Sequence, residues 1–210
     1  MTINDRQTLA TIIQNFEKNV ERLNNLVLVY QDTKIGAGRN TTHRSDLLRA
    51  VVIFNHASLE DFLRNVWVWL LPSMESEKLA QIPLKGTSPK ERRTKFDFSE
   101  LSKYKGQPVE KIIHESIEEY SNQISFNRIE DIINTLKEIG LEFSGEEKKQ
   151  FGLLSKMIRR RHHIVHQADR EEAKGKGYHR IKSISLTEVL RWKKVVENFV
   201  LLVHKKIITK

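Results

Sequence analysis

The stretch "DLLRAVVIFNHASLEDFLRNVWVWLL" (residues 46–71) decides the fold, because it reads as one long and mostly apolar helix. Ser45 is a candidate N-cap, since a serine hydroxyl can accept a hydrogen bond from a free amide of the first turn. Pro72 ends the segment, because proline has no amide hydrogen to donate within a helix. The stretch therefore predicts a helix over 46–71, which the rest of the chain must cover.

The segments on both sides also have helical spacing, with apolar side chains three and four positions apart. Helices are predicted over 3–30, 109–121, 128–140, 144–166 and 185–207. Pro108 suits the first helical position and Gly140 suits a C-cap. Capping-box patterns open two of these segments, at Ser144 with Glu147 and at Ser185 with Glu188. Because no strand pair, repeat or coiled-coil heptad is evident, we expect an all-α, up-and-down helical bundle.

Polar connections separate the predicted helices. The first contains Gly36 and Gly38, so we divide the chain into an N-terminal helix and linker (1–44), expected to pack on the bundle, and a helical domain (45–210). Residues 84–105 read as a basic loop with at most a short helix, and residues 169–182 as a mobile basic loop.

The composition fits a soluble protein with an anionic partner. The 210 residues are 39% hydrophobic and 30% charged, with a net charge of +9, and basic surfaces attract phosphate backbones. The absence of cysteine excludes disulfides and thiolate metal sites, and fits a reducing compartment. No apolar run approaches the ~18 residues of a spanning helix, and no secretory signal precedes the first helix. We therefore expect a cytoplasmic protein that does not contact a membrane.

The stretch "RRRHHIVH" (residues 159–166) is the candidate site. On a helix, His162 and His166 share one face, as do His163 and His166, whereas Arg161 and His166 lie about 140° apart. Histidine exchanges protons near neutral pH, and a guanidinium can clamp a phosphate. These groups suit cleavage of RNA, whose 2′-OH is its own nucleophile, so we expect no metal ion or other cofactor.

Three other interpretations of this stretch stay open. The pair His162 and His166 has the spacing of two metal ligands, although no clear third ligand is evident. The arginines and histidines also suit a phosphate-binding patch without catalysis. Finally, they suit a solvated helix end, where cations interact favourably with the helix dipole.

The stretch "RHHIVH" resembles the R-N-x-x-x-H signature of HEPN domains. Arg161 takes the arginine position and His166 the histidine position, while His162 stands where asparagine is usual. Residues 46–71 resemble the early helix of the RiboL-PSP-type HEPN branch, an apolar helix with an acidic residue before an aromatic and "LR". Its matching residues are Glu60, Asp61, Phe62, Leu63 and Arg64. The final segment, "LTEVLRWKKVVENFV", also fits that branch.

The resemblance implies a helical bundle that forms a homodimer, with the Arg–His pairs facing each other in one composite cleft. Many such proteins are metal-independent endoribonucleases of toxin–antitoxin or anti-phage defence systems. A cognate antitoxin or defence-system protein is therefore an expected partner, beside RNA. Other members only bind RNA or nucleotides, so a non-catalytic binding or protein-interaction module is the alternative.

The resemblance also suggests catalytic roles. His166 would be the general acid/base, Arg161 would steady the phosphate, and His162 or His163 would be the second proton-transfer group. Glu60 would orient one of these groups, although it also has the spacing to pair with His56. The products would be a 2′,3′-cyclic phosphate and a 5′-OH.

Basic residues beside aromatic ones are candidates for binding single-stranded RNA, with phosphates on the cations and bases on the rings. They are Arg92 and Arg93 near Phe96 and Phe98, then Lys174, Lys176 and Arg180 around Tyr178. Arg159 and Arg160 would add positive charge near the site. The alternative is that these loops are solvated and that their aromatic side chains pack on the core.

Overall fold

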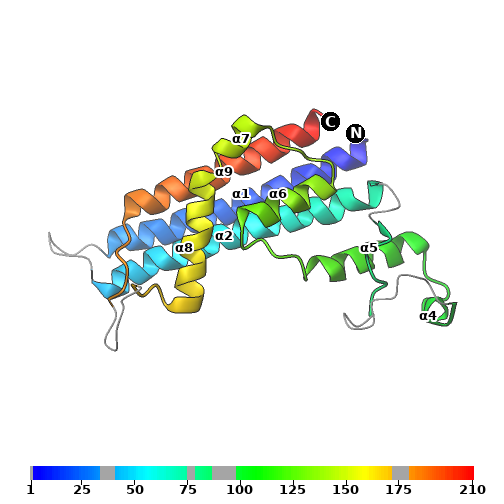
Figure 1. Cartoon of the computed structure of the whole chain (residues 1–210), viewed down its shortest axis with the longest axis horizontal. Helices are drawn as coiled ribbons and strands as arrows, with labels where there is room; N and C mark the ends of the chain where they lie inside the picture. The colour runs from blue at the N-terminus through cyan, green and yellow to red at the C-terminus, as the bar shows by residue number, and fades with distance from the viewer. Residues whose placement is uncertain (1, 34–40, 75–78, 87–97, 172–179) are drawn as a thin grey trace.

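A computed structural model describes residues 2–33, 41–74, 79–86, 98–171 and 180–210, which form a helical bundle (Figure 1). The elements are α1 (Ile3–Asp32), α2 (Thr42–Leu70), the 3-10 turn η1 (Leu71–Ser73), α4 (Phe98–Ser102), α5 (Val109–Ser121), α6 (Ile129–Glu138), α7 (Gly145–Lys149), α8 (Gly152–Gln167) and α9 (Leu186–Ile208). The predicted all-α bundle is confirmed. Within the described ranges, no helix has the length and apolar character needed to cross a membrane.

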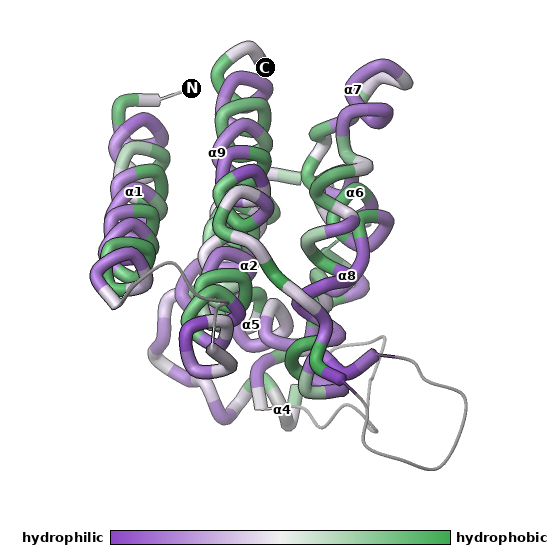
Figure 2. The backbone as a smooth tube through the Cα atoms, turned by 90° about the vertical axis from the view of Figure 1, so that its left-hand side faces the viewer, coloured by the Kyte–Doolittle hydropathy of each residue, from purple (hydrophilic) through white to green (hydrophobic). Residues whose placement is uncertain are grey.

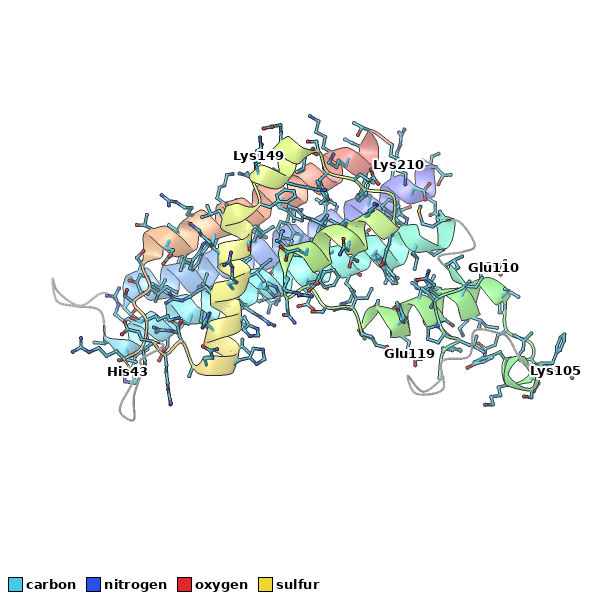
Figure 3. The ribbon with its side chains drawn as sticks, in the orientation of Figure 1. His43, Lys105, Glu110, Glu119, Lys149 and Lys210 are labelled. Atoms are coloured by element: carbon cyan, nitrogen blue, oxygen red, sulfur yellow. The ribbon has the colours of Figure 1, made fainter. Side chains whose placement is uncertain are left out.

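Helix α2 is the centre of the bundle, since α1, α5, α6, α8 and α9 all contact it. In the end-on view of Figure 2, α1 lies on one side of α9, whereas α6 and α8 lie on the other. Phe16 of α1 packs edge-on against Phe62 of α2, with ring centroids 5.8 Å apart. Apolar side chains fill the space between helices, while charged ones such as Glu110 and Lys149 stand at the outer surface (Figure 3).

The predicted start of α2 was wrong by one turn. The helix begins at Thr42, because the Thr41 hydroxyl accepts a hydrogen bond from the Arg44 amide at 3.4 Å and acts as the N-cap. Ser45 consequently lies inside the helix. The predicted end is confirmed, since α2 ends at Leu70 and the η1 turn that follows contains Pro72.

The predicted helix over 144–166 is broken into α7 and α8. The Ser144–Glu147 capping box is confirmed, but α7 ends at Lys149. The buried ring of Phe151 lies 5.3 Å from that of Phe143 and 5.1 Å from that of Phe199. This aromatic cluster fixes the corner from which α8 turns across the bundle.

The end of α6 explains the role of Gly140, which has a φ of 74°. Its amide donates to the carbonyl of Lys137 at 2.9 Å, and the amide of Leu141 donates to that of Leu136, also at 2.9 Å. This pair of bonds is a Schellman motif, which needs a left-handed residue after the C-cap. The glycine therefore stops the helix as predicted, one position beyond the C-cap Ile139.

The end of α8 is held by a buried ion cluster. The carboxylate of Asp169 is fully buried and accepts hydrogen bonds from Arg49 Nε and Arg160 Nη2, both at 2.8 Å. The same two guanidinium groups donate to the backbone carbonyl of Lys182, at 2.7 Å and 3.3 Å. Helix α8 is thereby tied to α2 and to the chain that leads into α9.

The segment predicted as a mobile basic loop is therefore well anchored at both ends. The Asp169 carbonyl accepts from the Lys182 amide at 2.8 Å, and Arg170 forms an antiparallel bridge with Ile181. Burial of Asp169 between two arginines holds the start of this segment in place. Lys174, Lys176 and Tyr178 lie outside the described residues, as do Arg92, Arg93 and Phe96.

Candidate functional site

Helix α8 carries the candidate residues on its outer faces. Its buried side chains are Leu154, Met157 and Ile158, which pack into the bundle, whereas His162 and His166 are exposed. The two imidazole rings have centroids 4.4 Å apart and are tilted by 45°. The expected shared face is thus present, and it presents two imidazole rings side by side to solvent.

His163 is half-buried beside this pair. Its Nδ1 lies 2.7 Å from Gln167 Oε1. Because an amide oxygen can only accept, Nδ1 carries the hydrogen in this contact. In the neutral ring Nε2 is then the acceptor, so His163 has a defined tautomer.

Arg161 reaches from α8 to the connection between α5 and α6. Its Nη1 donates to Asn127 Oδ1 at 3.0 Å, and its buried Nε has no hydrogen-bond partner among the described residues. Within the described chain no hydrogen bond or ion pair links Arg161 to His166. This divergence agrees with the angular separation of about 140° expected from their spacing.

Glu60 faces two residues of its own helix. It accepts a hydrogen bond from Arg64 Nη2 at 2.9 Å, and its other oxygen lies 3.7 Å from His56 Nδ1. No contact with the histidines of α8 is formed in the described part of the chain. Glu60 therefore lies beside His56, as the alternative expected, but His56 Nδ1 has no hydrogen-bond partner among the described residues.

His56 is buried in α2, beside Glu60. Its Nε2 lies 3.1 Å from the carbonyl oxygen of Phe126, so this nitrogen donates its hydrogen. Burial is the largest cause that lowers the pKa of His56, and the positive charge of Arg161 is the next. A neutral His56 thus anchors the connection between α5 and α6, which includes Asn127.

Arg64 holds the same connection from α2. Its guanidinium lies 5.3 Å from the ring centroid of Phe126 and donates to the carbonyl of Ile124 at 3.4 Å. The connection is therefore clamped by His56 and Arg64 together. Sequence reasoning missed Asn127. The related signal in the sequence was the i, i+4 spacing of His56, Glu60 and Arg64 on α2, because His56 and Arg64 hold the connection in which Asn127 lies.

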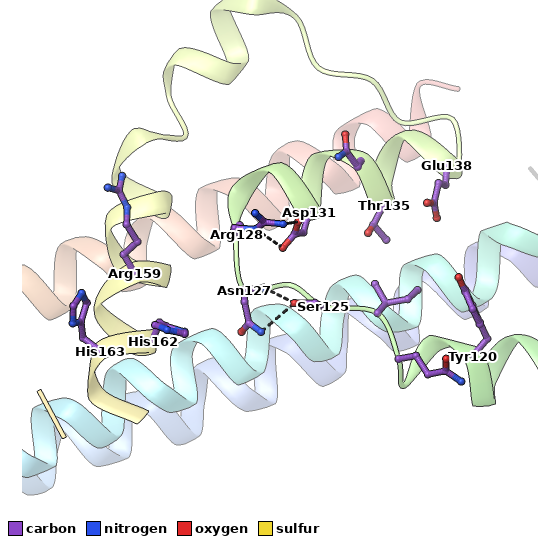
Figure 4. Close-up of a pocket in the computed structure, with 13 residues that line it drawn as sticks. Tyr120, Ser125, Asn127, Arg128, Asp131, Thr135, Glu138, Arg159, His162 and His163 are labelled. Atoms are coloured by element: carbon purple, nitrogen blue, oxygen red, sulfur yellow. Dashed lines mark hydrogen bonds and ion pairs between the residues drawn. The ribbon is translucent and has the colours of Figure 1, made fainter. Parts of the chain in front are cut away.

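An open pocket of about 700 Å³ lies between α5, α6 and α8 (Figure 4). Helix α6 contributes Arg128, Asp131, Thr135 and Glu138. The opposite wall is formed by Tyr120, Ser125 and Asn127, and α8 contributes Arg159, His162 and His163. Figure 4 shows Thr135 and Glu138 directed from α6 toward Tyr120, with His162 directed toward Asn127. His162 thus borders the pocket and also contacts His166.

The two charged ends of this pocket differ. At the α8 end, Arg159 is exposed and donates to Ser155 Oγ at 3.3 Å. Arg128 makes two hydrogen bonds to Asp131, at 3.0 Å and 3.2 Å, so this acid is already neutralised. At the far end, Glu138 accepts from the indole of Trp67 at 3.1 Å. The pocket therefore has an exposed arginine beside the histidines and a carboxylate held by Trp67 at its other end.

The remaining candidates for RNA binding have different surroundings. Arg160 is occupied by Asp169 and by the carbonyls of Lys182 and Ser183, which gives this side chain a structural role. Arg180 is exposed, and the side chain of Phe98 is 89% exposed, so Phe98 does not pack on the core.

The interpretation of His162 and His166 as metal ligands lacks further donors nearby. In the part of the chain that the structure describes, no group of three or more His, Cys, Asp or Glu side chains is placed to hold a metal ion.

Comparison with known proteins gives one match. No curated protein and no solved structure matches the chain significantly. The family model described as RiboL-PSP-HEPN matches residues 10–209, which include most of α1 and every later helix. HEPN domains are often ribonucleases, so the match points to an RNase or RNA-related function. Because the match covers nearly the whole sequence, the chain belongs to the RiboL-PSP-HEPN family.

Proposed function

We propose that this protein is a metal-independent endoribonuclease that cleaves RNA by attack of a 2′-OH on the adjacent phosphorus. The observation that carries the proposal is the exposed pair of His162 and His166, with ring centroids 4.4 Å apart, at the edge of an open pocket. Two adjacent imidazoles can supply both the proton acceptor and the proton donor that this reaction needs. The net charge of +9 and the family membership support RNA as the substrate.

In the proposed mechanism one imidazole takes the proton from the 2′-OH while O2′ forms a bond to phosphorus. The P–O5′ bond breaks, and the second imidazole gives a proton to the leaving O5′. The products are a 2′,3′-cyclic phosphate and a 5′-OH. His166 is assigned as one proton-transfer group and His162 as the other, since these two rings lie together on the exposed face.

Arg161 is assigned to the phosphate, because a guanidinium has five donors and the bond to Asn127 uses one of them. Its divergence from His166 within one chain favours a homodimer in which Arg161 of one chain and His166 of the other share a cleft. Mixing tests this arrangement, because a heterodimer of Arg161→Ala and His166→Ala chains would regain one intact composite site. Such a mixture should recover cleavage that neither variant has alone. If the subunits of the two variants exchange and the mixture stays inactive, both residues act in a site within one chain.

The central test is incubation of purified protein with varied RNAs in the presence of EDTA. Wild type should release fragments with cyclic phosphate ends, and His166→Ala should lose this activity by at least ~100-fold. His114→Ala, at an exposed position of α5, is the matched control and should cleave normally. Equal cleavage by wild type and His166→Ala would refute the proposal. Binding of RNA without any product would instead identify a non-catalytic RNA-binding module.

The family resemblance supports a proposal for the biological setting. We place the enzyme in a toxin–antitoxin or anti-phage defence system, with a cognate antitoxin or defence protein as partner. Expression of wild type in bacteria should then arrest growth, whereas His166→Ala should not. Normal growth with active, well-expressed enzyme would argue against a toxin.

A further inference from the structure

The arginine of the candidate site is held by an exposed residue of an irregular segment. Arg161 Nη1 donates to Asn127 Oδ1 at 3.0 Å, and Asn127 lies in the connection between α5 and α6. The Asn127 side chain is exposed, so core packing does not fix it. Holding such a residue in one conformation costs entropy, which other contacts must offset. The direction of the guanidinium therefore depends on the groups that hold this connection in place.

Ser125 sets the orientation of the Asn127 amide (Figure 4). Asn127 Nδ2 donates to Ser125 Oγ at 3.0 Å, and the backbone amide of Asn127 donates to the same oxygen at 3.3 Å. With its nitrogen turned toward Ser125, the side-chain amide presents its oxygen to Arg161. This is the orientation that a guanidinium requires, because all its polar groups are donors. Both Ser125 and Asn127 are exposed, so this arrangement depends on the backbone between them.

That backbone is fixed at Phe126. This residue is 1% exposed, and its carbonyl accepts a hydrogen bond from His56 Nε2 at 3.1 Å. The carbonyl belongs to the planar peptide group that joins Phe126 to Asn127, so holding its oxygen also sets the direction in which the chain enters Asn127. His56 is itself 1% exposed and lies in α2, the helix at the centre of the bundle. A side chain of the core thus bonds to the peptide directly before Asn127.

The neighbours of His56 define its tautomer. A carbonyl oxygen only accepts, so Nε2 carries the hydrogen, and Nδ1 of the neutral ring is an acceptor. An ionised Glu60 is also an acceptor, which explains why its Oε2 lies 3.7 Å from Nδ1 without a hydrogen bond. Burial lowers the pKa of His56 and so favours the neutral ring. The one hydrogen on the ring nitrogens is therefore directed at Phe126.

We propose that His56 is a positioning residue that sets the direction of Arg161 in the reaction. It acts through the carbonyl of Phe126 and then through the amide of Asn127. The inference rests on the proposed ribonuclease function, and it adds a buried residue of α2 to the arrangement on α8. Because Arg161 keeps its charge when His56 is replaced, the cleavage rate should suffer while the attraction of RNA persists.

Single-turnover cleavage by the full-length protein tests this role. His56→Met keeps a long buried side chain but donates no hydrogen bond, so the rate should fall ~10-fold while RNA affinity changes little. His56→Gln places a donor near the position of Nε2 and should recover most of the rate. A His56→Met enzyme that folds, as judged by circular dichroism, and keeps the wild-type rate would overturn the proposal. A His56→Gln enzyme no faster than His56→Met would overturn it as well.

Ser58→Ala is the matched control for these variants. Ser58 is also 1% exposed in α2, but its hydroxyl donates to the carbonyl of Phe54 in the same helix. Its replacement therefore removes a buried polar group of α2 without changing the bond to Phe126. The Ser58→Ala enzyme should cleave RNA at the wild-type rate. A loss as large as that of His56→Met would show that any disturbance of α2 has this effect, and would overturn the specific role.

A double-variant cycle tests the path from His56 to Arg161. If His56 acts through Asn127, a chain with both His56→Met and Asn127→Ala should be no slower than Asn127→Ala alone, because the path is already broken. Independent residues would instead give losses that multiply, to ~100-fold in the double variant. Multiplied losses would therefore overturn the path.

Nuclear magnetic resonance tests the same arrangement without any cleavage. In wild type, the nitrogen chemical shifts of the His56 ring should show a hydrogen on Nε2 and none on Nδ1, a result that needs no variant. The Arg161 Nε–H signal should move in His56→Met as it does in Asn127→Ala, and should stay near its wild-type position in His56→Gln. A hydrogen on Nδ1 of neutral His56, or an Arg161 signal that His56→Met leaves unmoved, would overturn the proposal.

The positioning role and the ribonuclease function fail in different ways. An Arg161 signal that follows the His56 variants, in a protein that cleaves no RNA, would keep the path from His56 to Arg161 and refute the ribonuclease. Cleavage that depends on His166 but is unaffected by His56→Met would keep the ribonuclease and refute the positioning role.

Discussion

Asn127 accepts a hydrogen bond from Arg161 Nη1 at 3.0 Å, although the two residues are 34 positions apart in the sequence. In the signature that "RHHIVH" resembles, an asparagine directly follows the arginine, whereas this chain has His162 there. An amide therefore does reach the arginine, but it comes from the connection between α5 and α6. This contact fixes one end of the guanidinium on the connection between α5 and α6.

Asn127→Ala should lower the cleavage rate by ~10-fold, because Arg161 would lose the partner that fixes its guanidinium. RNA affinity should change little, since the charge remains. Single-turnover cleavage and filter binding measure the two effects separately. Asn127→Asp is the control, because its carboxylate can accept the same hydrogen bond, and it should retain more activity than the alanine variant. An Asn127→Ala enzyme with the wild-type rate would show that this contact does not position Arg161.

His162→Asn would restore the residue that the family usually carries, but it should impair this enzyme. If His162 is the second proton-transfer group, its loss should lower the single-turnover rate by ~10²-fold or more. Binding of RNA should persist. An unchanged rate for the His162→Asn variant would mean that His163 is the second proton-transfer group. Measuring cleavage by His163→Gln would test this.

The stability of the protein should fall below about pH 6.5 in a way that depends on His56. Burial and the charge of Arg161 lower the pKa of His56 in the folded state, so between the lowered pKa and about 6.5 only the unfolded chain takes up this proton. The free energy of unfolding should therefore decrease as the pH falls from 7 toward 5, by up to about 1.4 kcal/mol per pH unit from this group.

His56→Gln isolates that contribution, because glutamine can still donate to the Phe126 carbonyl but does not titrate. Urea unfolding at several pH values should give a shallower decrease for the variant than for wild type. Parallel curves for the two proteins would contradict the lowered pKa.

Asp169→Asn should destabilise the fold by about 3–5 kcal/mol, because it removes the buried negative charge that Arg49 and Arg160 share. Asp46→Asn is the matched control, since Asp46 also pairs with Arg49, at 3.1 Å, but its side chain is 57% exposed. That variant should lose less than about 1 kcal/mol. Denaturant unfolding of both variants is the measurement, and similar losses would mean that the buried cluster has no special role.

Gly140→Ala should cost about 1–2 kcal/mol, because alanine is strained at a φ of 74°. The added Cβ would also lie 2.6 Å from Lys210 Nζ, although this flexible side chain can move. Gly152→Ala is the control, because nothing lies within 4 Å of its Cβ position at the start of α8. It should be neutral or slightly stabilising. Equal thermal stability of Gly140→Ala and wild type would show that the turn relaxes.

The helices could be predicted because their apolar spacing is local information. The break between α7 and α8 could not, since it depends on packing of Phe151 against Phe143 and Phe199. The early start of α2 was missed because Thr41 and Ser45 are both plausible N-caps, and the sequence does not rank them.

The candidate site could likewise be predicted only where it depends on local spacing. Neighbours on one helix, such as His162 and His166, follow from the helical period. The roles of Arg160 and Arg161 are set by Asp169 and Asn127, whose positions depend on how the chain returns to α8. The pocket likewise exists only because α6 lies opposite α8, and no local sequence pattern predicts that packing.

The bridge between Arg170 and Ile181 joins the two ends of the segment between α8 and α9. With Asp169 locked to α2 and its carbonyl bonded to Lys182, the ends of the intervening segment are fixed in space whatever its sequence. Changes between these two anchors should therefore leave α8 and α9 in place. The fold thus provides an insertion point near α8, where relatives can diversify and where an engineer can graft a new recognition module.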